Sequence, residues 1–483
     1  MWWEDAVIYQ IYPRSFQDSD GDGVGDLRGI ESRLDHLVEL GVDGLWTSPI
    51  YPSPMADFGY DVSDYEDIDP VFGDLASFDA LLEAAHARGL KLLMDLVPCH
   101  TSIEHPWFRD HPDWYVWADG ERPPNNWVAT FGGSAWTWHE PSGRWYLHSF
   151  YPEQPDLDWR NPELVEAMKN VVRFWIDRGV DGFRLDAIDR LGKDRELRDD
   201  PPATERPFNP VNHPDYAALE HRYSKNVWPE VGEALRALRE AADDALLVGE
   251  IYLPTPDWPG YLEHLDRVFA FELFHARLPW EPAALRAVIE RAHELDGAWV
   301  FSNHDAPRLA TRLGEQNARV AAMLLLTLPG MAFVYQGDEI GLTDGPGAEP
   351  PFDRAGRDGA RHPMQWDASA TGGFSTAEPW LPAVDPERRN VADQRADATS
   401  SLALYRRLIE LRPALGSGMA MRDAAAGLLV YERGDRHVVA LNLSDAAQEV
   451  PSVGAVVLAT GDPVTEQGRR LAPRAGAIFE RDC

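Results

Sequence analysis

Short apolar segments alternate with longer amphipathic ones along most of this sequence. Eight segments have the length and composition of buried β-strands, namely residues 6–12, 44–50, 91–98, 182–188, 245–253, 267–274, 298–304 and 331–337. Segments with the apolar spacing of helices lie between most of them. Because strands that alternate with helices pair in parallel, and eight such units close on themselves, the sequence predicts an α/β chain built on a (β/α)8 TIM barrel.

A repeated tetrapeptide marks two of the predicted helix-to-strand joints. GVDG occurs at 41–44 and at 179–182, each time between a helical pattern and a predicted strand. A glycine at this place ends a helix in the left-handed conformation, and a short turn then enters the strand. In the second copy the strand carries Arg184 and Asp186 among apolar residues, which is unusual for a buried strand.

Two long segments interrupt the alternation, and the end of the chain departs from it. Residues 101–160 are rich in Trp, Pro, Gly and His and are too long for a plain loop. We therefore predict a barrel from 1–100 and 161–416, a small domain inserted at 101–160, and an extra insertion at 190–227 after the fourth strand. GLLVYERGDRHVVALNLS indicates a hairpin with a Gly-Asp turn, which opens an all-β domain at 417–483.

Charge and cysteine content narrow the function classes. The formal net charge is -35, which repels nucleic acid and anionic lipid and favours small neutral partners. No stretch approaches the roughly 18 apolar residues of a membrane span, and we interpret the N-terminus as the first strand. With two cysteines, a disulfide framework and a zinc site are not expected, and a cytoplasmic location fits. The oligomeric state, monomer or homodimer, is left open.

Charged side chains gather at the predicted ends of several strands, where parallel barrels place their chemistry. They are Asp95, His100, Arg184, Asp186, Glu250, His304 and Asp305. Taken alone, Arg184 beside Asp186 is more readily a structural ion pair. Four charged strand ends around one rim favour catalysis instead, because desolvating so many ionisable groups is costly.

Paired carboxylates suggest cleavage of a glycosidic bond with retention of configuration. This mechanism needs one ionised carboxylate as nucleophile and one protonated carboxyl group facing it. We expect Arg184 to lower the pKa of Asp186, which makes Asp186 the candidate nucleophile. Glu250 has no basic neighbour in the sequence, so burial and the facing Asp186 are expected to raise its pKa. Glu250 is therefore the candidate acid/base.

Four segments resemble, in order and spacing, the signatures of the α-amylase family of glycoside hydrolases: DLVPCHTS (95–102), GFRLDAI (182–188), VGEIY (248–252) and FSNHD (301–305). The stretches GYDVSDY, FGGSAW, QPDLDW, NHDAPRLATRLG, YQGDEIGL and RDGARHPMQWD resemble its α-glucosidase and oligo-1,6-glucosidase branch. The resemblance implies Asp186 as nucleophile, Glu250 as acid/base and Asp305 as the third carboxylate, which orients ring hydroxyls.

The resemblance also implies a set of substrate-binding residues. His100, Arg184 and His304 would surround the same sugar ring, with Tyr60 stacking below it. Asp61 and Arg312 would form a salt bridge that closes the pocket on the terminal glucose and selects exo action.

The aglycone side of the pocket is expected to be lined by Phe131 and Phe150, since aromatic faces pack on sugar C–H surfaces. Ala187, after the nucleophile, stands where relatives often carry Val or Thr, and its small size favours α-1,4 over α-1,6 bonds. The sequence also departs from the branch at Ala306 and His362, so fine specificity stays open.

The stretch DSDGDGVGD at 18–26 suits a hard, oxygen-binding cation. The expected ligands of this structural Ca²⁺ or Mg²⁺ are the side chains of Asp18, Asp20, Asp22 and Asp26 and the carbonyl of Val24. A solvated acidic loop is the alternative. No organic cofactor is expected.

Three functions are compatible with these residues. The leading one is a retaining exo-α-glucosidase acting on short, neutral α-glucosides. The second is a transglucosylase or sucrose-type enzyme with the same machinery, in which an acceptor hydroxyl replaces water. The third is a non-catalytic scaffold, such as related transporter heavy chains form.

Overall fold

The computed structural model describes residues 1–204, 213–274, 278–450, 454–461 and 470–481. Its main sheet has eight strands in the order β10-β11-β1-β2-β3-β7-β8-β9, and every pairing in it is parallel. The strands are β1 (Val7–Ile11), β2 (Gly44–Thr47), β3 (Lys91–Leu96), β7 (Gly182–Leu185), β8 (Leu246–Gly249), β9 (Arg267–Val268), β10 (Trp299–Val300) and β11 (Ala332–Tyr335).

The edges of this sheet meet, so that it forms a barrel. Phe269, directly after β9, pairs in parallel with Ala298, directly before β10. The Ala298 amide donates to the Val268 carbonyl (2.9 Å), and the Ala270 amide donates to the Ala298 carbonyl (2.8 Å). All eight predicted strand segments therefore contain an observed barrel strand, which confirms the predicted fold class.

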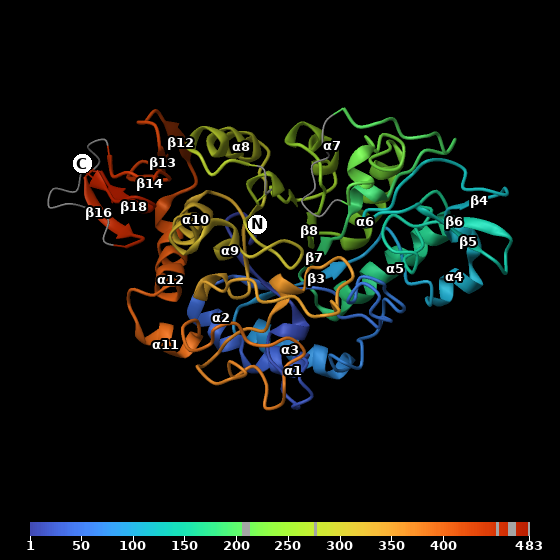
Figure 1. Ribbon diagram of the computed structural model, residues 1–483, viewed down its shortest axis with the longest axis horizontal. Helices are drawn as coiled ribbons and strands as arrows, with labels where there is room; N and C mark the ends of the chain where they lie inside the picture. The colour runs from blue at the N-terminus through green and yellow to red at the C-terminus, as the bar shows by residue number, and fades with distance from the viewer. Residues whose placement is uncertain (205–212, 275–277, 451–453, 462–469, 482–483) are drawn as a thin grey trace.

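Helices follow the strands around the outside of the barrel (Figure 1). They are α1 (Leu27–Ser32), α2 (Leu34–Leu40), α3 (Leu75–Ala87), α5 (Pro162–Arg178), α6 (Glu230–Ala242), α7 (Pro259–Leu262), α8 (Pro282–Glu294), α9 (Leu309–Leu313) and α10 (Glu315–Thr327), with α11 (Val391–Ala396) and α12 (Ser401–Leu411) after the last strand. None of the helices in the described ranges is long and apolar enough to cross a membrane.

The two GVDG joints have one structure. Gly41 ends α2 with φ 91°, and Gly179 ends α5 with φ 110°; both lie in the left-handed region that favours glycine. The aspartate of each copy accepts a hydrogen bond from the neighbouring strand, Asp43 from the Val7 amide (2.8 Å) and Asp181 from the Leu92 amide (2.9 Å). The tetrapeptide thus ends a helix and also aligns the start of the adjacent strand.

The segment between β3 and α5 forms a small sheet of its own. It contains α4 (Pro106–Asp110) and the strands β4 (Trp117–Ala118), β5 (Trp136–His139) and β6 (Arg144–Leu147), in the antiparallel order β4-β6-β5. The described part of the segment after β7 packs against it: the Trp127 indole donates to the Arg198 carbonyl (2.9 Å), and the Asn126 amide donates to the Asp200 carbonyl (2.9 Å). The two interruptions of the sequence pattern therefore meet on one side of the barrel.

A second sheet follows the barrel. Its order is β12-β13-β14-β18-β16, from β12 (Met419–Arg422), β13 (Leu428–Arg433), β14 (His437–Asn442), β16 (Ala455–Ala459) and β18 (Ala475–Glu480), with β15 (Gln448–Glu449) paired to β17 (Arg470–Leu471). The β13–β14 hairpin confirms the one expected around the Gly-Asp turn. This sheet lies at the opposite end of the molecule from the β4-β6-β5 sheet (Figure 1). The exact domain boundaries stay a prediction.

Candidate active site

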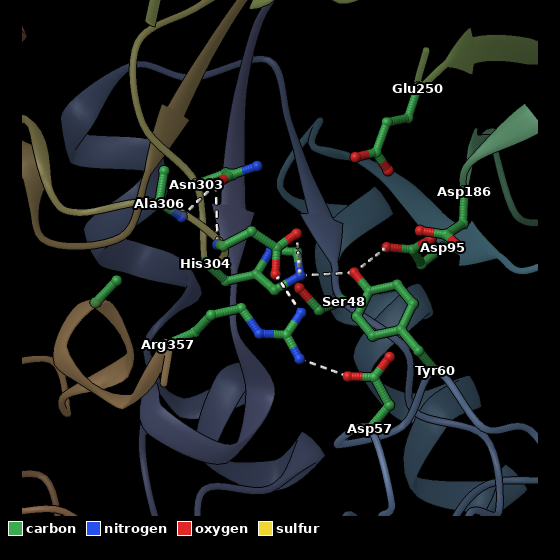
Figure 2. A network of polar contacts seen from close by, with 12 residues as sticks. Ser48, Asp57, Tyr60, Asp95, Asp186, Glu250, Asn303, His304, Ala306 and Arg357 are labelled. Atoms are coloured by element: carbon green, nitrogen blue, oxygen red, sulfur yellow. Dashed lines mark hydrogen bonds and ion pairs between the residues drawn. The ribbon is translucent and has the colours of Figure 1, made fainter. Parts of the chain in front are cut away.

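The carboxyl ends of three adjacent strands, β3, β7 and β8, bring the central charged residues together. Asp95 and Arg184 are register partners on β3 and β7, whereas Asp186 and Glu250 directly follow the ends of β7 and β8. Figure 2 shows Asp186 and Glu250 extending from neighbouring strands into the same region of the site. The strand pairing thus places both candidate catalytic carboxylates on one rim.

One buried guanidinium holds this group. The Nη1 atom of Arg184 donates to Oδ1 of Asp95 and to Oδ1 of Asp186, both at 2.7 Å, and its Nη2 atom contacts Oε2 of Glu250. Only 1% of the Arg184 side chain is exposed. Glu250 has no basic neighbour in the sequence, but the strand pairing puts Arg184 beside both catalytic candidates.

The prediction that Arg184 lowers the pKa of Asp186 below its usual value is wrong. Burial raises the pKa of Asp186 to about 6, although Arg184 acts in the opposite direction. Burial likewise raises the pKa of Asp95 to about 6. Because Asp186 shares its single cation with two other carboxyl groups, the attraction to Arg184 does not outweigh the loss of solvent.

Tyr60, which lines the pocket, stacks on the fully buried His304 behind it. The Tyr60 hydroxyl bonds to Nε2 of His304 (2.8 Å) and donates to Oδ2 of Asp95 (3.1 Å), and the two rings are stacked (Figure 2). The Gln10 amide lies 2.8 Å from Nδ1 of His304, and since an amide nitrogen can only donate, Nδ1 accepts and Nε2 carries the proton. Burial lowers the pKa of His304 to about 3, so this ring is neutral at pH 7.

Asp305, the third candidate carboxylate, is held by two arginines from a distant part of the chain. Arg357 Nη1 (2.9 Å) and Arg361 Nη2 (3.2 Å) both reach its Oδ1 atom. Burial alone would raise the pKa of Asp305, but His304, Arg357 and Arg361 together hold it well below its usual range. Asp305 is therefore ionised throughout the neutral range.

The prediction of a salt bridge between Asp61 and Arg312 is wrong. Asp61 is buried away from the pocket, where it accepts hydrogen bonds from the Ser53 hydroxyl and from the amides of Ala56 and Asp57. Arg312 donates to the carbonyls of Phe274, Phe301 and Pro307. Asp61 and Arg312 therefore bond to different groups and not to each other.

The ion pair that borders the pocket joins Asp57 to Arg357 instead (Figure 2). Asp57 precedes Asp61 in the stretch ADFGYD, and Arg357 opens RDGARHPMQWD. Arg357 lies within a stretch that resembles the family, and Asp57 lies two residues before another, GYDVSDY, but the sequence did not reveal that these two residues face each other.

A single pocket collects most of the expected binding residues. It is lined by the predicted Tyr60, His100, Phe131, Phe150, Asp186, Ala187, Glu250 and Asp305. It is also lined by residues that the sequence did not single out for binding: Asp57, Thr130, Asp189, Arg190, Tyr252 and Arg357. Asp189 and Arg190 directly follow the second family-like segment, and Tyr252 is the last residue of the third, a signal that could have found them.

The acidic loop between β1 and α1 brings three of its carboxylates together. One oxygen of each of Asp18, Asp20 and Asp22 lies within 4.8 Å of the others. Asp26 begins α1, and its carboxylate accepts from the Gly29 amide (2.7 Å) and from Ser19. The geometry therefore groups three of the four predicted side-chain ligands.

Comparison with known proteins adds the family. The sequence profile of the alpha amylase catalytic domain matches residues 10–417. The chain belongs to the α-amylase family of glycoside hydrolases. A further family, described as a domain of unknown function (DUF3459), matches residues 415–478.

Individual relatives are similar over nearly the whole chain. A "Probable alpha-glucosidase" of Rhizobium meliloti is 42% identical, covering 93% of this chain and 91% of the relative. An "Oligo-1,6-glucosidase" of Parageobacillus thermoglucosidasius is 39% identical, covering 85% and 84%. Among solved structures, the alpha-glucosyl transfer enzyme XgtA superimposes with a TM-score of 0.92 at 39% identity, covering 100% and 99%.

Proposed function

We propose that the protein is a retaining, exo-acting α-glucosidase that hydrolyses terminal α-glucosidic bonds of short, neutral oligosaccharides. The observation that carries this proposal is the convergence of Asp186, Glu250 and Asp305, from three different strand ends, on one pocket. Relatives with matching names support it.

The two steps of the reaction follow from the positions of Asp186 and Glu250. An oxygen of Asp186 forms a bond to the anomeric carbon while the glycosidic C–O bond breaks, and Glu250 gives its proton to the departing oxygen. Glu250 then takes a proton from water, which attacks the same carbon and releases Asp186. Arg184 contacts both carboxylates and positions them for this exchange.

Exo action is proposed from the charged end of the pocket. Asp57, Arg357 and Asp305 form one connected ion-pair group there. Ionised carboxylates and a guanidinium offer acceptors and donors for the hydroxyls of a terminal glucose. An additional sugar at that end would have to displace this group.

A preference for α-1,4 over α-1,6 bonds is proposed from Ala187. This residue lines the pocket directly after Asp186, in the left-handed conformation with φ 44°. Its methyl group leaves more room for a secondary-hydroxyl aglycone than a branched side chain would.

Transglucosylation is the second candidate function. It is favoured by the similarity to the alpha-glucosyl transfer enzyme XgtA over the whole chain. Trehalulose synthase MutB, at a TM-score of 0.88 and 30% identity, is a further structural relative. A non-catalytic scaffold receives no support, because the three candidate catalytic carboxylates share one pocket.

A structural Ca²⁺ or Mg²⁺ in the Asp18–Asp26 loop is part of the proposal. Asp20 and Asp22 are exposed and Asp18 is buried. Nearby carboxylates raise the pKa of Asp20, although its largest single influence, the Asp22 amide, lowers it. Mutual repulsion of this kind fits a site that a cation would neutralise. A bound ion would hold the loop and take no part in the reaction.

A cytoplasmic location is proposed on the cysteine content. Of the two cysteines, Cys99 is a free, buried thiol, and Cys483 lies outside the described residues. Proteins in reducing compartments commonly keep their cysteine thiols unpaired.

Two substitutions at the catalytic carboxylates test the chemistry. Asp186→Asn should lower kcat on maltose by about a thousandfold or more, because no glycosyl-enzyme can form. Glu250→Gln should lose maltose hydrolysis but still react with α-glucosyl fluoride, whose leaving group needs no proton. The matched control is Asp177→Asn, on the exposed surface of α5, which should change neither.

The same assay reports the stereochemistry and linkage. The sugar first released should be α-glucose, measured by NMR, and maltose should be cleaved faster than isomaltose. Near wild-type activity of Asp186→Asn on maltose, or release of β-glucose, would disprove the retaining mechanism.

A further inference from the structure

Arg190 lies in the turn after the candidate nucleophile, on the wall of the catalytic pocket. Only 5% of its surface is exposed. Its Nη2 atom donates to the Thr130 hydroxyl (3.1 Å) and to the Tyr216 hydroxyl. These two residues belong to the β4-β6-β5 segment and to the insertion after β7, so Arg190 joins both walls.

Two aromatic rings lie close to this guanidinium. The Cζ atom lies 5.7 Å from the centre of the Phe150 ring and 5.2 Å from the centre of the Tyr216 ring. Phe150 also lines the pocket. Guanidinium groups pack favourably on aromatic rings, so these two contacts help to hold Arg190 at the pocket wall.

Part of the guanidinium of Arg190 has no acceptor among the described residues. Only Nη2 makes hydrogen bonds there, and Nε lies 3.7 Å from Asp189, too far for one. Neither Nε nor Nη1 of Arg190 is among the fully buried polar atoms of the described residues that lack a partner, so this part of the group is accessible from the pocket. The Nη1 side of Arg190 is therefore available to an oxygen atom of a molecule in the pocket.

The charge around Arg190 is held in place by buried pairs. Lys225 forms an ion pair with Asp189 (3.0 Å), and Lys193 forms one with Asp156 (2.7 Å). The chain has only four lysines, and two of them serve this wall. Since both lysines are paired with carboxylates, they add little attraction for an anion.

The pocket itself disfavours an anionic partner for Arg190. Asp186, Glu250 and the ionised Asp305 line the same pocket, and an anion beside them would be repelled. A neutral hydroxyl group accepts a hydrogen bond from a guanidinium without this repulsion. The chemistry of the wall therefore fits a polyhydroxylated, uncharged group.

We propose that Arg190 donates a hydrogen bond to a hydroxyl group of the sugar on the leaving-group side of the scissile bond, and so selects sugar aglycones and sugar acceptors. This inference rests on the proposed α-glucosidase function and concerns its specificity. Arg190 stabilises the aglycone, whereas Asp186, Glu250 and Asp305 act on the glucose unit.

The test compares two substrates that differ only beyond the scissile bond. Maltose has a sugar aglycone, whereas α-glucosyl fluoride has none. Arg190→Gln should lower kcat/KM for maltose by about ten- to a hundredfold, the effect of losing one charge-assisted hydrogen bond. It should leave kcat/KM for α-glucosyl fluoride within about threefold. Retained activity on the fluoride also shows that the variant is folded.

The matched control is Arg198→Gln. Arg198 belongs to the same insertion and pairs with Asp194, but half of its side chain is exposed, and it does not line the pocket. This variant should keep the wild-type ratio of the two substrates. Arg190→Lys retains a charged N–H donor group and should recover part of the maltose activity.

A second readout uses the acceptor. With α-glucosyl fluoride as donor and glucose as acceptor, Arg190→Gln should shift the products from disaccharide toward glucose, because the same hydroxyl contact is lost. An unchanged substrate ratio and product partition in Arg190→Gln would overturn the inference while leaving the proposed function intact. Equal losses on both substrates would also overturn it, since they would indicate a role in holding the fold or the nucleophile.

The outcome for the wild-type protein separates this inference from the proposed function. Wild-type protein that cleaves neither substrate would refute the α-glucosidase assignment and, with it, the role of Arg190. Wild-type protein that cleaves both, with Arg190→Gln impaired only on maltose, supports both.

Discussion

The ionisation of Asp186 depends on how one guanidinium is shared. Arg184 contacts Asp95, Asp186 and Glu250, so its single positive charge faces three carboxyl groups. Burial is the largest cause of the raised pKa of Asp186, and the charge of Asp95 raises it further. A nucleophile with a pKa of about 6 is ionised and active at neutral pH, and it loses its charge in mild acid.

A pH profile of the wild-type protein tests the raised pKa of Asp186. Below about pH 6, Asp186 should gain a proton and lose its nucleophilicity, so kcat/KM for maltose should fall as pH falls through that value. His304 does not contribute to this limb, because its pKa is lowered to about 3. Activity that persists unchanged down to pH 4 would contradict the raised pKa.

At the scale of elements, the loops beyond the strands build the closed end of the pocket. Asp57 lies between β2 and α3, Arg357 lies between β11 and α11, and Asp305 follows β10. Arg357 also pairs with Asp353 (2.7 Å). One arginine thus ties together loops that belong to different barrel units.

Arg357→Gln should remove this tie and leave buried carboxylates unpaired. Breaking a buried ion pair typically costs about 3–5 kcal/mol, so both the free energy of unfolding and kcat/KM for maltose should fall. The control is Arg354→Gln, whose pair with Glu153 is partly exposed (47% and 40%). Thermal unfolding of that variant should change by no more than about 1 kcal/mol. Equal stability of both variants would argue against a closing role for Arg357.

At the scale of the whole molecule, the acidic loop links the start of the chain to the region after the barrel. The Asp18 carboxylate accepts from the Ser375 hydroxyl (2.5 Å), and the Asp18 amide donates to the Phe374 carbonyl (3.0 Å). A cation held by this loop would therefore stabilise a long-range contact.

Metal removal tests the loop. Treatment with a chelator should lower Tm, and Ca²⁺ or Mg²⁺ should restore it, since a ligand bound only to the native state stabilises by about 2.7 kcal/mol at a hundredfold excess over Kd. In Asp22→Asn, Tm should no longer respond to the ion. Wild-type protein that contains no metal by elemental analysis, and whose Tm ignores both treatments, would leave the solvated acidic loop as the explanation.

The sequence by itself determined the barrel and the residues at its rim. Strand and helix patterns are local, and parallel strands place their ends together, so Asp186, Glu250 and Asp305 could be assigned to one site before any coordinates. The GVDG joints were equally local. Ca²⁺ or Mg²⁺ ligands could be proposed from spacing alone, although Asp26 caps a helix in the structure.

Only the tertiary structure decided how the charges pair. The sequence predicted a salt bridge between Asp61 and Arg312, whereas the structure pairs Asp57 with Arg357. The two loops involved are distant in the sequence, and no local pattern predicts which of their residues meet. The pKa of Asp186 depends on burial and on Asp95 across the sheet. Arg190 meets Thr130 and Tyr216 only because two insertions pack together. Chain order predicts which residues reach the rim, whereas through-space contacts set their charge and their partners.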